Sequence, residues 1–224
     1  MGKQKKALII APTGLVGSLL LNLLENSNHY HSIVSISRSK PRQTPNKSNS
    51  KITHIITDFH HLDRFENAFS VDDIFCCIGT TMDQTKSIDL YKIIELYFPK
   101  TIARLGEKNK VSSISIISCI GADSKASNYY LNIKGELEEL IQSFNFKATH
   151  IYRPSLITGS RKNKRLKEIL ARPICGLLGC IPGLSNYGAI KASQLANSMI
   201  NNALLDKKGI FYYNRDEILE NQKV

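Results

Sequence analysis

Residues able to carry acid–base chemistry lie close together near the middle of the chain. Tyr130 and Lys134 are one helical turn apart, so a helix would place both on one face. The Lys134 ammonium would lower the pKa of the phenol from about 10 toward neutrality, which makes Tyr130 a usable proton donor. Ser118, at the end of an apolar run, would hold a substrate carbonyl. The alternative is a surface tyrosine packed over a lysine stem.

A glycine-containing turn near the N-terminus joins an apolar run to a leucine-rich one. Gly14 would let the backbone approach a pyrophosphate, and Gly17 would let a helix pack close to the preceding strand. Free amides and the dipole at the helix start attract anionic groups. We therefore expect a dinucleotide to bind at Ala11, Thr13, Gly14, Leu15, Val16 and Gly17. Ala11 replaces the first glycine of the usual pattern and should alter the turn. The alternative is a plain strand–helix turn.

Basic and hydroxyl side chains end the second apolar run, where an NAD-selective protein would carry an acid. Arg38, Ser39 and Lys40 stand there instead, and they would bind a 2′-phosphate. NADP(H) is therefore preferred over NAD(H), which stays possible; the alternative is ordinary solvated charge. Asp58, after the third run, would lie near the adenine edge or cap a helix.

These residues must be positioned by short apolar runs that alternate with longer amphipathic ones, a pattern typical of an α/β doubly wound parallel sheet, the Rossmann fold. Seven strands are expected at Lys6 to Ala11, Ser32 to Ser37, Ile52 to Thr57, Asp73 to Ile78, Ser113 to Ser118, Thr149 to Arg153 and Ile210 to Tyr213. Helices are expected at Leu15 to Leu24, Leu90 to Leu105, Leu131 to Phe144 and Ser193 to Leu205. Pro99 predicts a kink or a helix start.

Composition is that of a globular protein, with 224 residues, 42% of them hydrophobic and 22% charged. We expect residues 1–224 to form one domain, with an irregular substrate cover or dimer contact at about 159–188. The net charge of +11 is scattered and not interleaved with aromatics, which makes nucleic acid an unlikely partner. Five cysteines without close metal-site spacing predict reduced thiols and no metal. No signal peptide or membrane span is evident, so the expected location is cytoplasmic.

Four strings resemble the atypical short-chain dehydrogenases/reductases, in the Tat-interacting-protein oxidoreductase-like branch. They are APTGLVG (11–17), CCIGTT (76–81), SCIGADSKASNYYLNIKGELE (118–138) and YRPSLITG (152–159). The resemblance implies NADPH binding and a Ser-Tyr-Lys catalytic set at Ser118, Tyr130 and Lys134. It also implies that Gly79 and Thr80 lie near the cofactor ribose and that Arg153 and Pro154 lie beside the nicotinamide.

Cys119 departs from this resemblance, because the branch carries a second serine at that position. If the catalytic hydroxyl belongs there, this chain has a thiol in its place. A nucleophilic Cys119 is a further alternative, although no histidine lies nearby in the sequence to activate it.

These observations favour an NADP(H)-dependent oxidoreductase that acts on an unidentified carbonyl or alcohol by hydride transfer, with Tyr130 as general acid or base. The alternative is an NADPH-binding redox-sensing or regulatory protein with little or no turnover, because a fold does not define a function. Binding of nucleic acid or anionic membranes would depend on charge alone. The expected assembly is a monomer or a homodimer.

Overall fold

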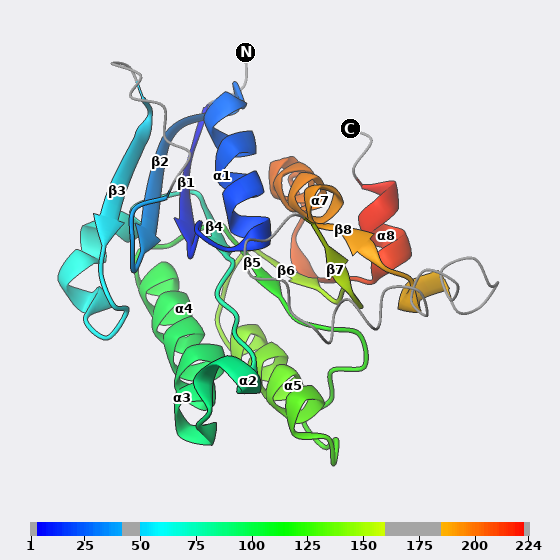
Figure 1. Ribbon diagram of the computed structural model, residues 1–224. Coiled ribbons are helices and arrows are strands. Elements are labelled where there is room, and N and C mark those ends of the chain that lie inside the picture. Colours follow the sequence, from blue (N-terminus) through cyan, green and yellow to red (C-terminus); the bar gives the residue numbers. More distant parts are fainter. Residues whose placement is uncertain (1–3, 42–49, 160–184, 222–224) are drawn as a thin grey trace.

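A seven-stranded sheet, parallel throughout, forms the centre of the computed structural model, which describes residues 4–41, 50–159 and 185–221 (Figure 1). The strand order is β3-β2-β1-β4-β5-β6-β9, so the direction of winding reverses between β1 and β4. The strands are β1 (Lys5–Ile10), β2 (Tyr30–Ser37), β3 (Ile52–Ile56), β4 (Asp73–Cys76), β5 (Ser113–Ile117), β6 (Ala148–Tyr152) and β9 (Gly209–Tyr213).

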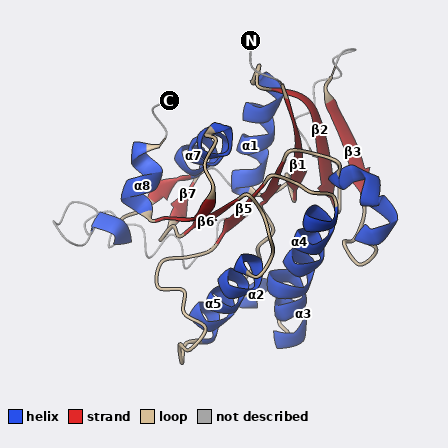
Figure 2. Cartoon of the chain, turned by 180° about the vertical axis from the view of Figure 1, so that it is seen from behind, coloured by secondary structure: helices blue, strands red, loops and turns tan. Residues whose placement is uncertain are grey.

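Helices cover both faces of this sheet, as Figure 2 shows from behind. One face carries α1 (Leu15–Asn26), α7 (Ala192–Leu204) and α8 (Arg215–Glu220). The other carries η1 (Leu62–Phe69), α4 (Phe98–Lys108) and α5 (Tyr129–Gln142). Before α4 the chain forms α2 (Met82–Thr85), α3 (Ile88–Lys92) and the π-helical turn η2 (Ile93–Tyr97). The short strands β7 (Ile157–Thr158) and β8 (Ile190–Lys191) pair separately, and η3 (Ser185–Tyr187) precedes β8.

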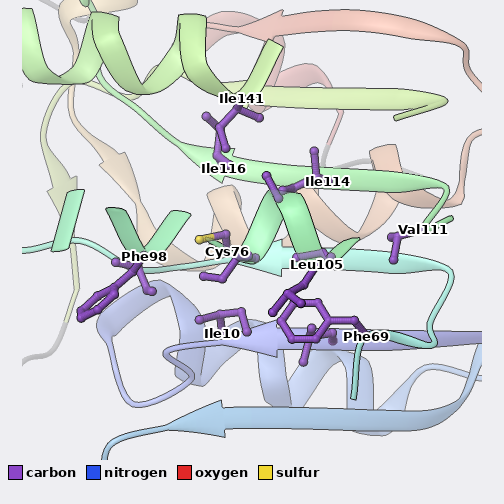
Figure 3. Packing of buried hydrophobic residues seen from close by; sticks show 14 of the residues in the cluster. Ile10, Phe69, Cys76, Phe98, Leu105, Val111, Ile114, Ile116 and Ile141 are labelled. Atoms are coloured by element: carbon purple, nitrogen blue, oxygen red, sulfur yellow. The ribbon is translucent and has the colours of Figure 1, made fainter. Parts of the chain in front are cut away.

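The core consists of two hydrophobic clusters, one on each face of the sheet. Figure 3 shows the cluster beneath α4 and α5, where Ile10, Cys76, Ile114 and Ile116 of the strands meet Leu105 and Ile141 of the helices. Burial on both faces explains the wholly apolar strand sequences, because neither set of alternating side chains meets water.

The predicted doubly wound fold is confirmed, with all seven strands at nearly their predicted bounds. Pro99 lies near the beginning of α4, directly after the π-helical turn η2, but no separate helix starts there: α3, η2 and α4 follow one another without a gap, and Tyr97 and Phe98 keep helical backbone angles. The expected helix start at Pro99 is therefore replaced by a π-helical turn just before the proline, within one continuous helical segment. The short elements η1, α2, α8, β7 and β8 were not predicted. Residues 160–184 of the expected irregular region lie outside the described residues. In the described ranges no helix is long and apolar enough to cross a bilayer.

Candidate functional site

A cleft of about 710 Å³ opens where β1, β4 and β5 end, at the point where the winding of the sheet reverses. Such a switch point is where open α/β sheets bind ligands, because the loops diverge there. Most of the predicted site residues line this cleft: Thr13, Gly14, Leu15, Val16, Gly17, Ser39, Gly79, Thr80, Ser118, Tyr130, Lys134 and Pro154. Ala11, Arg38, Asp58 and Arg153 are not among the lining residues.

The glycine-containing turn closes between β1 and α1 although its first glycine is replaced. Ala11 takes a left-handed conformation with φ 58°, and its carbonyl accepts a 3.3 Å hydrogen bond from the Gly14 amide. A Cβ on Gly17 would lie 2.5 Å from the Ala11 carbonyl oxygen, so only glycine permits this approach of helix and strand. Gly14 caps α1 without a side-chain hydrogen bond, and the first turn contains no acid. The positive end of the helix therefore faces the cleft without a carboxylate in its own first turn.

The end of β2 presents its polar residues unequally to the cleft. Arg38, Ser39 and Lys40 are all exposed, but Ser39 and Lys40 line the cleft and Arg38 does not. The Ser37 hydroxyl donates a 2.7 Å hydrogen bond to the Ser39 carbonyl and holds this bend. Asp58 accepts a 3.0 Å hydrogen bond from the His60 amide in the loop before η1. It is not the predicted helix cap, because the N-cap of η1 is His61 and no side chain caps that helix. Lys40 is thus the basic group of this segment that reaches the cleft.

Ser118 follows β5 directly and is 4% exposed. Its amide donates a 2.7 Å hydrogen bond to the Tyr152 carbonyl, but its Oγ has no hydrogen-bond partner among the described residues. A buried hydroxyl without a partner is unfavourable by about 1–3 kcal/mol. Ser118 is also one of the residues that line the cleft.

Helix α5 positions Tyr130 in its first turn. The Asn128 side chain caps this helix by accepting hydrogen bonds from the amides of Tyr130 and Leu131, at 3.0 and 3.2 Å. Tyr130 is 43% exposed and lines the cleft, and it forms a side-chain hydrogen bond with Cys119. Burial raises the pKa of Cys119, which opposes the thiolate that a nucleophilic cysteine requires.

Lys134, one turn further along α5, is buried against a carboxylate that the sequence analysis did not single out. Its Nζ lies 2.8 Å from Glu95 Oε2 and donates a second hydrogen bond, 3.1 Å long, to the Ile117 carbonyl. Glu95 Oε1 accepts a 2.7 Å hydrogen bond from the Thr80 amide, and Glu95 lines the cleft. The available signal was an acid within the apolar stretch Ile93-Ile94-Glu95-Leu96. Glu95 lies in the π-helical turn η2, and such turns are often found at functional sites.

Arg153 is turned toward the outer edge of the sheet instead of the cleft. Its Nε donates a 2.9 Å hydrogen bond to Glu138, its Nη2 pairs with the same carboxylate, and its guanidinium lies 4.3 Å from the centre of the Tyr212 ring. Pro154, the next residue, does line the cleft. Within the described ranges no group of three or more His, Cys, Asp or Glu side chains could hold a metal ion, and Cys76, Cys77 and Cys119 are free.

Comparison with known proteins identifies relatives that span most of the chain, although no family model matches it. The fmp52 protein of Aspergillus niger is 30% identical over 197 residues, which cover 86% of this chain and 84% of the relative. That of Emericella nidulans is 31% identical over 202 residues, 87% and 85% of the two chains. Protein HTATIP2 of Rattus norvegicus is 27% identical over 225 residues, which cover 99% of this chain and 88% of the relative.

Solved structures share the fold. A UDP-N-acetylglucosamine 4-epimerase from Methanobrevibacter ruminantium, in complex with UDP-N-acetylmuramic acid, superimposes with a TM-score of 0.72 at 15% identity, covering 95% of this chain and 77% of that chain. The Bordetella bronchiseptica enzyme WbmG, in complex with NAD, gives a TM-score of 0.69 at 13% identity, and the match covers 95% of this chain and 73% of that chain. At this identity the likeness concerns the fold.

The names of the fungal relatives correct one prediction. Several FMP52 proteins are named as mitochondrial, which contradicts the cytoplasmic location expected from the sequence. The inference was too broad, because the missing apolar segment argues only against a secretory signal. Mitochondrial targeting segments are amphipathic and rich in arginine and serine instead.

Proposed function

The chain belongs to the NAD(P)-binding atypical short-chain dehydrogenases/reductases that include the HTATIP2 and FMP52 proteins, and on that premise we propose an NADP(H)-dependent oxidoreductase of a carbonyl or alcohol substrate. The observation that carries this proposal is the convergence of two groups on one cleft. The open amide end of α1 lines one part of it, and Ser118, Tyr130 and Lys134 line another.

The cleft residues fit a dinucleotide. A volume of about 710 Å³ lies in the range of cofactor sites. Gly17 allows the close helix–strand contact that brings the uncapped amides of α1 to the cleft, where they suit a pyrophosphate. Lys40 and Ser39 supply a cation and a hydroxyl for a 2′-phosphate, which supports NADP(H) over NAD(H).

The side chains of the cleft suit proton transfer to and from a substrate oxygen. A bound nicotinamide would supply or accept the hydride. Ser118 Oγ, which lacks a described partner, would donate a hydrogen bond to the substrate oxygen. Tyr130, exposed to the cleft, would give a proton to that oxygen in reduction or take it in oxidation. Lys134 would contribute an ammonium group behind it.

Replacing Tyr130 with Phe tests this assignment. Turnover with NADPH over a panel of aldehydes and ketones should fall by about 100-fold or more, because a positioned general acid contributes 10²–10⁴-fold. Calorimetric NADPH affinity should change little. Tyr97→Phe is the matched control, since Tyr97 is 53% exposed and does not line the cleft. Full turnover by Tyr130→Phe would exclude Tyr130 as the proton donor.

The alternative of cofactor sensing without turnover has one observation in its favour. Glu95 offsets the charge of Lys134, the group that would activate Tyr130. A wild-type protein that binds NADPH in the micromolar range but turns over no carbonyl or alcohol of a broad panel would support this alternative over the enzyme.

A further inference from the structure

Lys134 and Glu95 form an ion pair that is almost completely removed from water, with side-chain exposures of 6% and 1%. Taking a charge out of water is unfavourable, and an unpaired buried lysine usually loses its proton. Burial alone lowers the pKa of Lys134, but the charge of Glu95 and its hydrogen bond reverse this and hold the pKa above its ordinary value. The carboxylate therefore determines that this lysine is a cation.

The other titratable groups facing Lys134 supply no compensating charge. They are Cys76, Cys119 and Tyr91, which come from the ends of β4 and β5 and from α3. Burial raises the pKa of Cys76 to about 11 and that of Tyr91 further, and it also raises the pKa of Cys119. These groups are neutral near pH 7, so the pairing of Lys134 depends on Glu95.

Among the residues that the structure describes, the hydrogen bonds of the pair leave one donor of Lys134 open. An ammonium group has three N–H donors, and two of them are directed to Glu95 Oε2 and the Ile117 carbonyl. Glu95 uses its other oxygen to bind the Thr80 amide, in the loop that follows β4. One carboxylate thus connects three segments that line the cleft: the loop, the π-helical turn η2 and α5.

We propose that Glu95 is a positioning residue: its carboxylate keeps Lys134 an ammonium ion at the cleft and holds the Thr80 loop beside it, so that the third N–H of Lys134 can donate to a bound dinucleotide. The identity of the ligand rests on the proposed function. The charge state of Lys134 does not.

The isosteric variant Glu95→Gln separates charge from shape. Glutamine keeps one oxygen for Lys134 and fits the same space, but it leaves the buried ammonium without a counter-charge. Its NH2 group cannot accept the hydrogen bond of the Thr80 amide, so affinity should fall somewhat at every pH, and the pH dependence reports the loss of charge. Lys134 should then lose its proton as pH rises through the neutral range, and the donor to the ligand weakens with it. Glu95→Asp, which keeps the charge, should restore the wild-type pH dependence even if affinity is lower.

Calorimetric titration with NADPH between pH 6 and pH 9.5 measures this effect. The ratio of Glu95→Gln to wild-type affinity should fall by about tenfold across the range, the size of one charge-assisted hydrogen bond. Glu66→Gln is the control, because Glu66 pairs with Lys108 at 2.7 Å on the exposed side of α4. A Glu95→Gln profile parallel to those of wild type and Glu66→Gln would overturn the proposal.

A second readout needs no ligand. In protein labelled at lysine side chains, the Lys134 Cε resonance, assigned by its loss in Lys134→Met, should stay unshifted up to pH 9.5 in wild type and titrate near neutrality in Glu95→Gln. Titration at the same pH in both would overturn the role of Glu95. If wild type bound no dinucleotide, the proposed function would fail, while this resonance would still decide the charge state of Lys134.

Discussion

Arg38 and Lys40 carry the same charge and lie two residues apart in the bend after β2, but only Lys40 lines the cleft. The hydrogen bond from Ser37 to the Ser39 carbonyl holds a bend in the chain, and Ser39 and Lys40 line the cleft while Arg38 does not. A basic string in the sequence therefore identified the segment. The bend of the backbone decided which of the two basic side chains lines the cleft.

The contribution of Lys40 can be measured from cofactor preference. Lys40→Ala should weaken NADPH binding by roughly tenfold, because one charge-assisted contact to a 2′-phosphate is lost, and should leave NADH binding nearly unchanged. Fluorescence titration with both dinucleotides gives the ratio. Arg38→Ala is the control and should reduce NADPH affinity less. Equal losses for NADPH and NADH would show that Lys40 does not contact a 2′-phosphate.

Ala11 shows how far a motif rule holds at a single position. The rule expects glycine because the turn needs a positive φ, and Ala11 adopts φ 58° with its side chain present. This conformation costs an alanine on the order of 1 kcal/mol, which the hydrogen bonds around the turn offset. Gly17 has no such tolerance, because its neighbour is a backbone oxygen at 2.5 Å.

At the scale of elements, α5 is positioned by its contact with the loop that precedes it. A Cβ on Gly135 would lie 2.0 Å from the Ser124 amide nitrogen and 2.2 Å from the Asp123 carbonyl carbon. These neighbours are backbone atoms, which cannot move aside as the end of a flexible side chain can. This glycine, next to Lys134, therefore sets how closely the helix carrying Tyr130 approaches the end of β5.

Gly135→Ala should lower the free energy of unfolding by about 1–3 kcal/mol, the usual cost of overpacking, although alanine by itself favours a helix by about 1 kcal/mol. Urea unfolding followed by circular dichroism measures the change. Gly79→Ala is the control, because its Cβ would meet nothing closer than Glu95 Oε1 at 3.8 Å, and it should shift stability by about 0.5 kcal/mol or less. A stable Gly135→Ala would mean that α5 can move away from the loop.

The elements that sequence patterns identified and those they missed differ in burial and length. The seven strands are short apolar runs between turns, and α1 and α5 bury regular faces, so their periodicity is strong. The one-turn helix α2 buries no residue, and β7 and β8 have two residues each. Such segments are too short to show a periodic pattern of apolar residues. They form because neighbouring parts of the fold stabilise them.

At the scale of the whole molecule, a polar residue lies deep in the sheet. His150 of β6 is fully buried, its Nδ1 lies 3.0 Å from the Tyr213 hydroxyl, and its ring stacks between the rings of Phe211 and Tyr213. Burial, with smaller effects of Lys207 and Lys5, lowers the pKa of His150 to about 4. The folded protein therefore keeps this ring neutral in weakly acidic solution, where an unfolded chain would protonate it.

Stability should consequently decrease in acid. Because the folded pKa is below the unfolded value of about 6.5, the unfolded chain binds more protons, and the stabilisation is lost as pH falls from about 6.5 to 4. The full effect is on the order of 3 kcal/mol. Urea unfolding at several pH values should show a shallower acid decline for His150→Gln than for wild type. His29→Gln, at an exposed position, should follow wild type; a shared slope for all three would remove His150 as the cause.

The fold, and the end of the sheet at which the candidate site was expected, could both be predicted from the sequence because they depend on local patterns. Alternating apolar runs define the parallel sheet, the turn at 11–17 must follow its first strand, and residues four apart must share a helix face. Only the tertiary structure decided which charges pair, Glu95 with Lys134 and Arg153 with Glu138. It also decided that Lys40, and not Arg38, lines the cleft. These outcomes depend on how helices pack on the sheet and how loops bend, which bring together residues that no local spacing relates.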